Sequence, residues 1–110
     1  MYQPSLIKEQ LTGVGQFTTA TDATAIAAAD VVIKAAPGRL CRIIVTTATT
    51  AAQPITFYDN ATAGSGKIIF IIPGAAAVAT FYDVQMPCAL GITIAKNTSL
   101  AAGAITISWI

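Results

Sequence analysis

Charged side chains are scarce in this sequence of 110 residues, and histidine is missing altogether. Only 10% of the residues are charged, whereas an ordinary soluble domain has about 25%. The net charge is +1, and the six Lys and Arg residues are scattered except for Arg39 and Arg42. The chain lacks the basic footprint of nucleic-acid binding, so no nucleic-acid partner is expected. Its weakly charged surface indicates that copies of the chain, or another protein, cover it.

The absence of histidine excludes several kinds of site. Ser-His-Asp and Cys-His catalytic groups and histidine-ligated metal sites all require this residue. The acids show no sign of a pair tuned for catalysis. They are Glu9, Asp22, Asp30, Asp59 and Asp83. Residues 63–68, AGSGKI, resemble the end of a phosphate-binding loop, but that motif requires glycine at Ala61 and Ser or Thr at Ile68. The sequence therefore predicts a protein that is not an enzyme and has no cofactor or metal.

The sequence also lacks the patterns of a secretion signal and of a membrane-spanning segment. Residues 1–13 do not combine a basic start with an apolar core, as a secretion signal does. The most apolar run, residues 68–79, is interrupted by Pro73 and Gly74 and is shorter than the ~20 residues that span a bilayer. We therefore expect synthesis in the cytoplasm and no membrane partner.

The sequence has two cysteines, Cys41 and Cys88. Cytoplasmic proteins normally keep their thiols reduced. Cys41 also lies among aliphatic residues, which favours a buried thiol that acts as a small apolar side chain. We expect two free thiols, with a disulfide between them as the alternative.

Short runs of β-branched and aromatic residues, separated by turns rich in Gly, Pro, Asn and Ala, dominate the chain. This pattern is typical of all-β sandwiches and barrels. The predicted strands are residues 14–20, 30–35, 39–48, 54–59, 67–72, 78–84, 91–95 and 104–109. About eight strands fit a single two-sheet β-sandwich of the jelly-roll kind over residues 14–110. Residues 19–29 are rich in alanine and predict an irregular or short helical stretch, with Thr21 or Asp22 as the cap of a helix there, before the strand at residues 30–35.

Alternation of apolar and polar residues identifies the core. In residues 104–109 every second side chain is large and apolar, and in residues 39–45 Cys41, Ile43 and Val45 share a face opposite Arg42. The predicted core residues are Ile43, Val45, Phe57, Phe70, Phe81, Ile105, Ile107 and Trp109. The run KIIFIIP at residues 67–73 has large apolar side chains on both faces instead. Such a strand must be covered on both sides, so it is either central between layers or part of a subunit interface.

The tetrapeptide TFYD occurs twice, at residues 56–59 and 80–83. If the strands around these copies form a meander with the run 67–73 between them, the two copies lie parallel on either side of that run. Phe57 and Phe81 then flank Phe70 in one layer. The tyrosines that follow them, Tyr58 and Tyr82, then face outward at a wetter surface.

The aspartates that end the two copies, Asp59 and Asp83, have two interpretations. In the first, the two carboxylates come from neighbouring loops and bind a calcium ion. A calcium ion takes about six to eight oxygen ligands, however, and two aspartates supply far fewer. Aspartate is also a common turn former at the end of a strand. We favour the turn interpretation for both residues.

Three segments together resemble small structural proteins from the virion gene modules of tailed bacteriophages. They are APGRLCRIIVTTA, ITFYDNATAGSGKIIFIIP and FYDVQMPCALGITIA. The resemblance covers about residues 30–110. It implies a non-enzymatic capsid decoration or cement protein, assembled as a homotrimer and bound to the major capsid protein on the outer surface of the virion. No binding residue follows from the resemblance.

Two other functions stay open. One is a tail or baseplate component with a similar fold. The other is a carbohydrate-binding jelly roll, for which the candidate aromatic residues are Trp109, Tyr58 and Tyr82. Trp109 shares a face with Ile105 and Ile107, so we favour a core role for it.

Residues 1–13 show no strand or helix period and are expected to form an extended N-terminal arm. Its apolar side chains have no core strand of their own, which makes them candidates for gripping the capsid or a neighbouring subunit. These residues are Tyr2, Leu6, Ile7 and Leu11.

Overall fold

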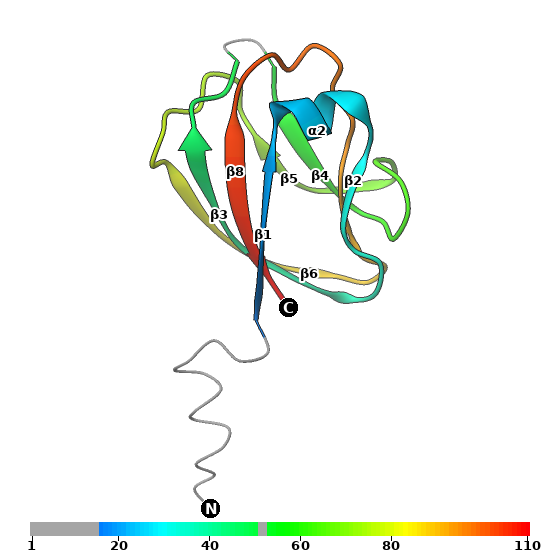
Figure 1. The fold of residues 1–110 in the computed structure, drawn as a ribbon. Helices are drawn as coiled ribbons and strands as arrows, with labels where there is room; N and C mark the ends of the chain where they lie inside the picture. The colour runs from blue at the N-terminus through cyan, green and yellow to red at the C-terminus, as the bar shows by residue number, and fades with distance from the viewer. Residues whose placement is uncertain (1–15, 51–52) are drawn as a thin grey trace, which may run out of the picture.

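The computed structural model describes residues 16–50 and 53–110 (Figure 1). Within these ranges the chain forms eight strands and one short helix, α2 (Ala23–Ala28). The strands are β1 (Phe17–Asp22), β2 (Val31–Lys34), β3 (Gly38–Thr47), β4 (Ile55–Asp59), β5 (Lys67–Ile72), β6 (Phe81–Cys88), β7 (Ile92–Ile94) and β8 (Ala104–Trp109). The prediction of an all-β fold with about eight strands is confirmed. The predicted arm, with Tyr2, Leu6, Ile7 and Leu11, lies outside the described residues.

The strands form two four-stranded sheets in which every pairing is antiparallel. Sheet A has the order β1-β8-β3-β6, and sheet B has the order β2-β7-β4-β5. In Figure 1, β1, β8 and β3 lie in front of β4 and β5. One apolar core takes side chains from both sheets. Its fully enclosed members are Leu40, Ile43, Val45, Phe57, Ile72, Ile92, Ile94, Ile105 and Ile107.

Alternation along β8 and β3 determines which side chains enter this core. Ile105 and Ile107 are buried, and their partners on β3 are Val45 and Ile43, which are also buried. Trp109 continues the same face at the end of β8 and is partly buried against the core. The side chains between these positions lie on the outer face of sheet A, as expected for strands with one buried face.

Helix α2 connects β1 to β2 and has only six residues. The Asp22 side chain accepts a hydrogen bond from the backbone N–H of Ala25 at 3.0 Å, which satisfies one of the unpaired donors at the helix start. The helix residues Ala23 and Ile26 are buried. Asp22 is therefore the cap, and the division of this region into a short helix and a following strand is confirmed.

The predicted meander is wrong, because β6 does not pair with β5. β6 lies beside β3 in sheet A, whereas β5 lies at the edge of sheet B. The connection over residues 73–80 crosses from one sheet to the other and is fixed to β3. Val45 donates a backbone hydrogen bond to the carbonyl of Thr80 at 2.8 Å, and its own carbonyl accepts one from Ala79 at 2.7 Å. The run KIIFIIP is consequently an edge strand and is not central.

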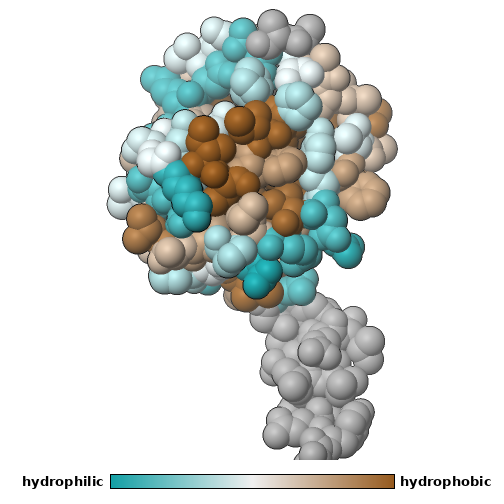
Figure 2. All heavy atoms as spheres, turned by 180° about the vertical axis from the view of Figure 1, so that it is seen from behind, coloured by the Kyte–Doolittle hydropathy of each residue, from teal (hydrophilic) through white to brown (hydrophobic). Residues whose placement is uncertain are grey.

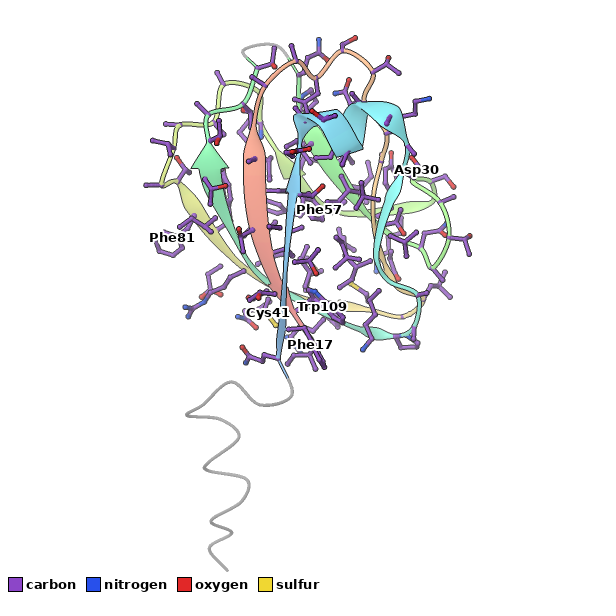
Figure 3. All side chains as sticks on the ribbon, viewed as in Figure 1. Phe17, Asp30, Cys41, Phe57, Phe81 and Trp109 are labelled. Carbon is purple, nitrogen blue, oxygen red and sulfur yellow. The ribbon has the colours of Figure 1, made fainter. Side chains whose placement is uncertain are left out.

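The two copies of TFYD have opposite orientations relative to the core. Phe57 is buried, as predicted, whereas Phe81 is 65% exposed and is not a core residue. The cause is the pairing of β6 with β3, which sets Tyr82 opposite the buried Ile43 and therefore turns Phe81 outward. Figure 3 shows Phe57 inside the domain and Phe81 pointing away from it.

Tyr82 consequently takes the inward place that was predicted for Phe81. Its ring lies 5.1 Å from the ring of Phe70, which is partly buried and lies 6.4 Å from the ring of Phe57. The expectation that Tyr82 faces outward is therefore wrong. These three rings span the space between the edge strands β5 and β6.

Candidate interaction surface

Asp59, at the end of the first TFYD copy, fastens the loop that leads into β7. Its carboxylate accepts hydrogen bonds from the backbone N–H groups of Ala89 at 3.0 Å, Leu90 at 2.8 Å and Gly91 at 3.3 Å. The side chain is buried, so these donors replace the water that it has lost. Asp59 is thus a structural anchor for a loop far along the chain. The local turn bonds, from the N–H groups of Thr62 and Ala63, go to Asn60 instead, so the turn interpretation applies to Asn60 and not to Asp59.

Asp30 makes a second anchor of the same kind. Its carboxylate accepts hydrogen bonds from the backbone N–H groups of Gly64 at 2.9 Å and Lys96 at 2.7 Å. This ties the glycine-rich loop between β4 and β5 to the segment that follows β7. A Cβ atom on Gly64 would lie 2.5 Å from the Cα of Ala95, so the loop comes too close for any larger residue there. The AGSGK segment therefore has a structural role in this fold.

Both anchors respond to pH. Burial raises the pKa of Asp59, but the three backbone donors and Lys67 outweigh it and leave the pKa below its ordinary value. The backbone donors Gly64 and Lys96 likewise lower the pKa of Asp30. A carboxylate with a lowered folded-state pKa contributes stability above its ordinary pKa of about 4, and this contribution is lost as the pH falls through the folded-state value.

We therefore expect the protein to lose stability as the pH falls below about 4 toward the lowered pKa values at which the two folded-state anchors become protonated. The urea midpoint of unfolding should be lower at pH 3 than at pH 7. Substituting Asp59→Asn should reduce the difference between the two midpoints, because one of the titrating anchors is gone. Equal midpoints of the unmodified protein at both pH values would contradict this account.

The second copy of the tetrapeptide ends in a different environment. Asp83 is exposed, and its carboxylate lies 3.6 Å from the Nε of Arg42 on the outer face of sheet A. Within residues 16–50 and 53–110, no group of three or more His, Cys, Asp or Glu side chains lies close enough to hold a metal ion. No helix in these ranges is long and apolar enough to cross a membrane.

Cys41 and Cys88 both lie in the described part of the chain and are free, buried thiols. Burial raises the pKa of each thiol above its ordinary value. Such thiols are poorly nucleophilic, because the reactive form is the thiolate. The disulfide alternative does not apply to this structure.

The aromatic residues considered for carbohydrate binding do not form one platform. Trp109 and Tyr82 belong to sheet A, and Tyr58 belongs to sheet B. The Trp109 ring stacks on Phe17 with a centroid distance of 4.9 Å, and its indole N–H donates to the hydroxyl of Thr19 at 3.0 Å (Figure 3). Trp109 therefore closes one end of the core and is not an open stacking surface.

The exposed apolar side chains of β5 form the candidate interaction surface. Ile68 and Ile71 are 49% and 47% exposed. They lie on the outer face of sheet B, beside their partners on β4, Tyr58 and Thr56. We call these four residues the β5 patch. Figure 2, which views the molecule from behind Figure 1, shows an apolar area in the middle of this side, surrounded by hydrophilic residues.

A smaller apolar pair lies on the outer face of sheet A. Ile44 of β3 is the direct partner of Phe81 of β6, and both are exposed. The ion pair between Arg42 and Asp83 is the next pair along these two strands. The β5 patch also has a charged pair beside it, Lys67 and Asp59, but Asp59 is buried, whereas Arg42 and Asp83 are both exposed.

The free edges of β5 and β6 differ in how they are protected against pairing. β6 contains Pro87, and Gln85 has a positive φ of 50°, which interrupts the strand. Both features are common protections of edge strands. β5 has an extra residue at Ile69 and a lysine at its start, but it contains no proline and its residues after Lys67 are all large and apolar. Among the described residues, only β4 forms backbone hydrogen bonds with this strand.

The sequence identified part of this surface. The two-faced run 67–73 correctly indicated apolar side chains that the core does not take. The outward position of Ile44 follows from the same alternation that places Arg42 outside, but we did not assign it a role. The exposure of Phe81 was not predicted, because either Phe81 or its neighbour Tyr82 is a good candidate for the core.

No family of known proteins, no curated protein sequence and no solved structure matches this chain.

Proposed function

We propose that this chain is a non-enzymatic structural protein of a bacteriophage virion, which associates with copies of itself and coats the outer surface of the capsid. The observation that carries the proposal is the β5 patch, an uncharged apolar surface on an edge strand. Large exposed apolar areas on soluble domains usually mark protein interaction sites. The resemblance of residues 30–110 to phage virion proteins adds the capsid as the partner.

The strand pairing supports a jelly-roll sandwich as the scaffold of this function. A jelly roll is an eight-stranded antiparallel hairpin that is rolled into two sheets, so its first strand pairs with its last and its second with its seventh. The pairs β1-β8, β2-β7, β3-β6 and β4-β5 follow this rule. Jelly rolls occur in capsid proteins and in lectins, so the fold alone does not choose between these functions.

The anchored loops fit a structural role better than a catalytic one. The carboxylates of Asp30 and Asp59 accept hydrogen bonds from backbone N–H groups of other segments. Loops that are tied to neighbouring segments lose less conformational entropy on binding, which favours attachment to a fixed surface.

The location of the protein in the virion is the test of this function. Particles are purified from a culture that produces the chain and are labelled with gold-conjugated antibodies against it. We expect label over the shell in electron micrographs. Label over the tail would support a tail or baseplate component instead. Particles without the protein would contradict the proposed function.

A further inference from the structure

We propose that two copies of this chain associate by pairing their β5 strands antiparallel, about a two-fold axis that passes between Ile69 and Phe70. The inference rests on the self-association in the proposed function and names the contact that produces it. The occupant of the β5 edge is thus a second copy of the same strand. The contact joins sheet B of one copy to sheet B of the other.

The first argument is the irregular side-chain pattern of β5. Phe57 of β4 pairs with Phe70, but the next residue, Tyr58, pairs with Ile68. Ile69 is therefore an extra residue, and the strand has a bulge at this point. As a result Ile68 and Ile71 face outward and are about half exposed, whereas Ile69 is buried and Phe70 packs against the core.

Along residues 68–71 the side chains face outward, inward, inward and outward, so the pattern is the same in both chain directions. The side chains of a regular strand alternate strictly between the two faces. If such a strand paired with β5, its side chains would face the same way as their β5 partners on one side of the bulge and the opposite way on the other side. A second copy of β5 that runs antiparallel has its own two consecutive inward-facing residues, Ile69 and Phe70, directly opposite those of the first copy. Ile68 then faces the partner's Ile71, and the same pair recurs across the axis.

The second argument concerns charge. Lys67 is the one charged residue of β5, and it lies at the start of the strand. In the proposed register Lys67 lies opposite the partner's Ile72, so the two ammonium groups are at opposite ends of the contact. Four isoleucine side chains occupy the middle of the outer face, where apolar cross-strand pairs stabilise a sheet.

The resemblance to phage proteins implies a trimer, whereas the pattern of β5 is matched by a two-fold axis. The assembly that we infer from β5 is therefore a dimer. A trimer requires a different contact, and the mass of the particles in solution separates the two.

Charge substitutions at positions 68 and 71 test both the contact and its register. The full chain is analysed by size-exclusion chromatography with light scattering. We expect twice the chain mass for the unmodified protein. Ile68→Glu and Ile71→Lys should each raise the dissociation constant by at least about 100-fold, because each places an unpaired charge in an apolar contact.

Mixing the two single variants should restore association, because the introduced carboxylate at position 68 then faces the introduced amine at position 71 of the other chain. Ile44→Glu is the matched control, since Ile44 is similarly exposed but lies on sheet A. It should leave the mass unchanged. Circular dichroism verifies that every variant is folded.

Three results would overturn the inference. They are a monomer at micromolar concentration, a trimer whose mass neither single variant changes, and two weakened variants that do not associate when mixed. In the first case, pairing that appears only after removal of residues 1–13 would assign the edge to the chain's own arm. Gold label over the shell with any of these results would leave the capsid location in the proposed function standing, while an intact pair without label would contradict that location alone.

Discussion

Replacing Phe57 with alanine will lower the free energy of unfolding by about 4 kcal/mol, the usual cost of removing a buried phenylalanine ring. Phe57 has no exposed surface, and its ring contacts Phe70 in the middle of the core. The loss is a large part of the ~5–15 kcal/mol that stabilises a typical domain. Urea unfolding, followed by the fluorescence of the single tryptophan, Trp109, measures the change.

Phe81→Ala is the matched control, because it changes the same residue in the other copy of TFYD. Phe81 is 65% exposed, so we expect a loss below about 1 kcal/mol. If Phe57→Ala does not fold, the milder Phe57→Leu provides a measurable variant in the same position. Equal losses at positions 57 and 81 would contradict the assignment of opposite orientations to the two copies.

Asp59→Ala should lower the free energy of unfolding by about 3 kcal/mol at pH 7, since three backbone N–H groups lose a charged acceptor. The loop from Cys88 to Gly91 leads into β7, which lies inside sheet B between β2 and β4. Loss of the anchor should therefore also increase hydrogen exchange of the amides at 89–91. Urea unfolding and exchange measured by mass spectrometry provide the two readouts.

The corresponding change in the second copy, Asp83→Ala, should cost less than about 1 kcal/mol, because an exposed ion pair contributes little. It should leave hydrogen exchange in the 89–91 loop unchanged. A larger loss for Asp83→Ala than for Asp59→Ala would show that the outer pair with Arg42, and not the loop anchor, stabilises the fold.

The positions of most strands were predictable because each strand signals itself locally. The exception is β6, which was predicted at residues 78–84 and lies at Phe81–Cys88. β8 is an example: alternation of Ile105 and Ile107 with polar residues identifies its bounds and its inner face without knowledge of any neighbour. Asp22 was predictable as a helix cap for the same reason, since a cap acts within one helical turn.

The arrangement of the sheets was not predictable in this way. Alternation says which residues share a face, but it does not say which strands are neighbours. The meander was predicted because consecutive strands often pair. The chain instead crosses to the other sheet over residues 73–80, where Ala75 and Ala79 have positive φ angles that favour glycine. No glycine marks these two positions in the sequence, and the turn signal of Pro73 and Gly74 does not tell which sheet the chain enters next.

The central position of β8 has a consequence for biosynthesis. β8 lies between β1 and β3, so it supplies the middle of sheet A although it is the last strand of the domain. Its contacts reach far along the chain: Thr19 and Trp109 are 90 residues apart. Sheet A therefore cannot be completed on the ribosome before residue 109 has left the exit tunnel. A high contact order of this kind slows folding, and until then the nascent chain exposes the inner faces of β1 and β3.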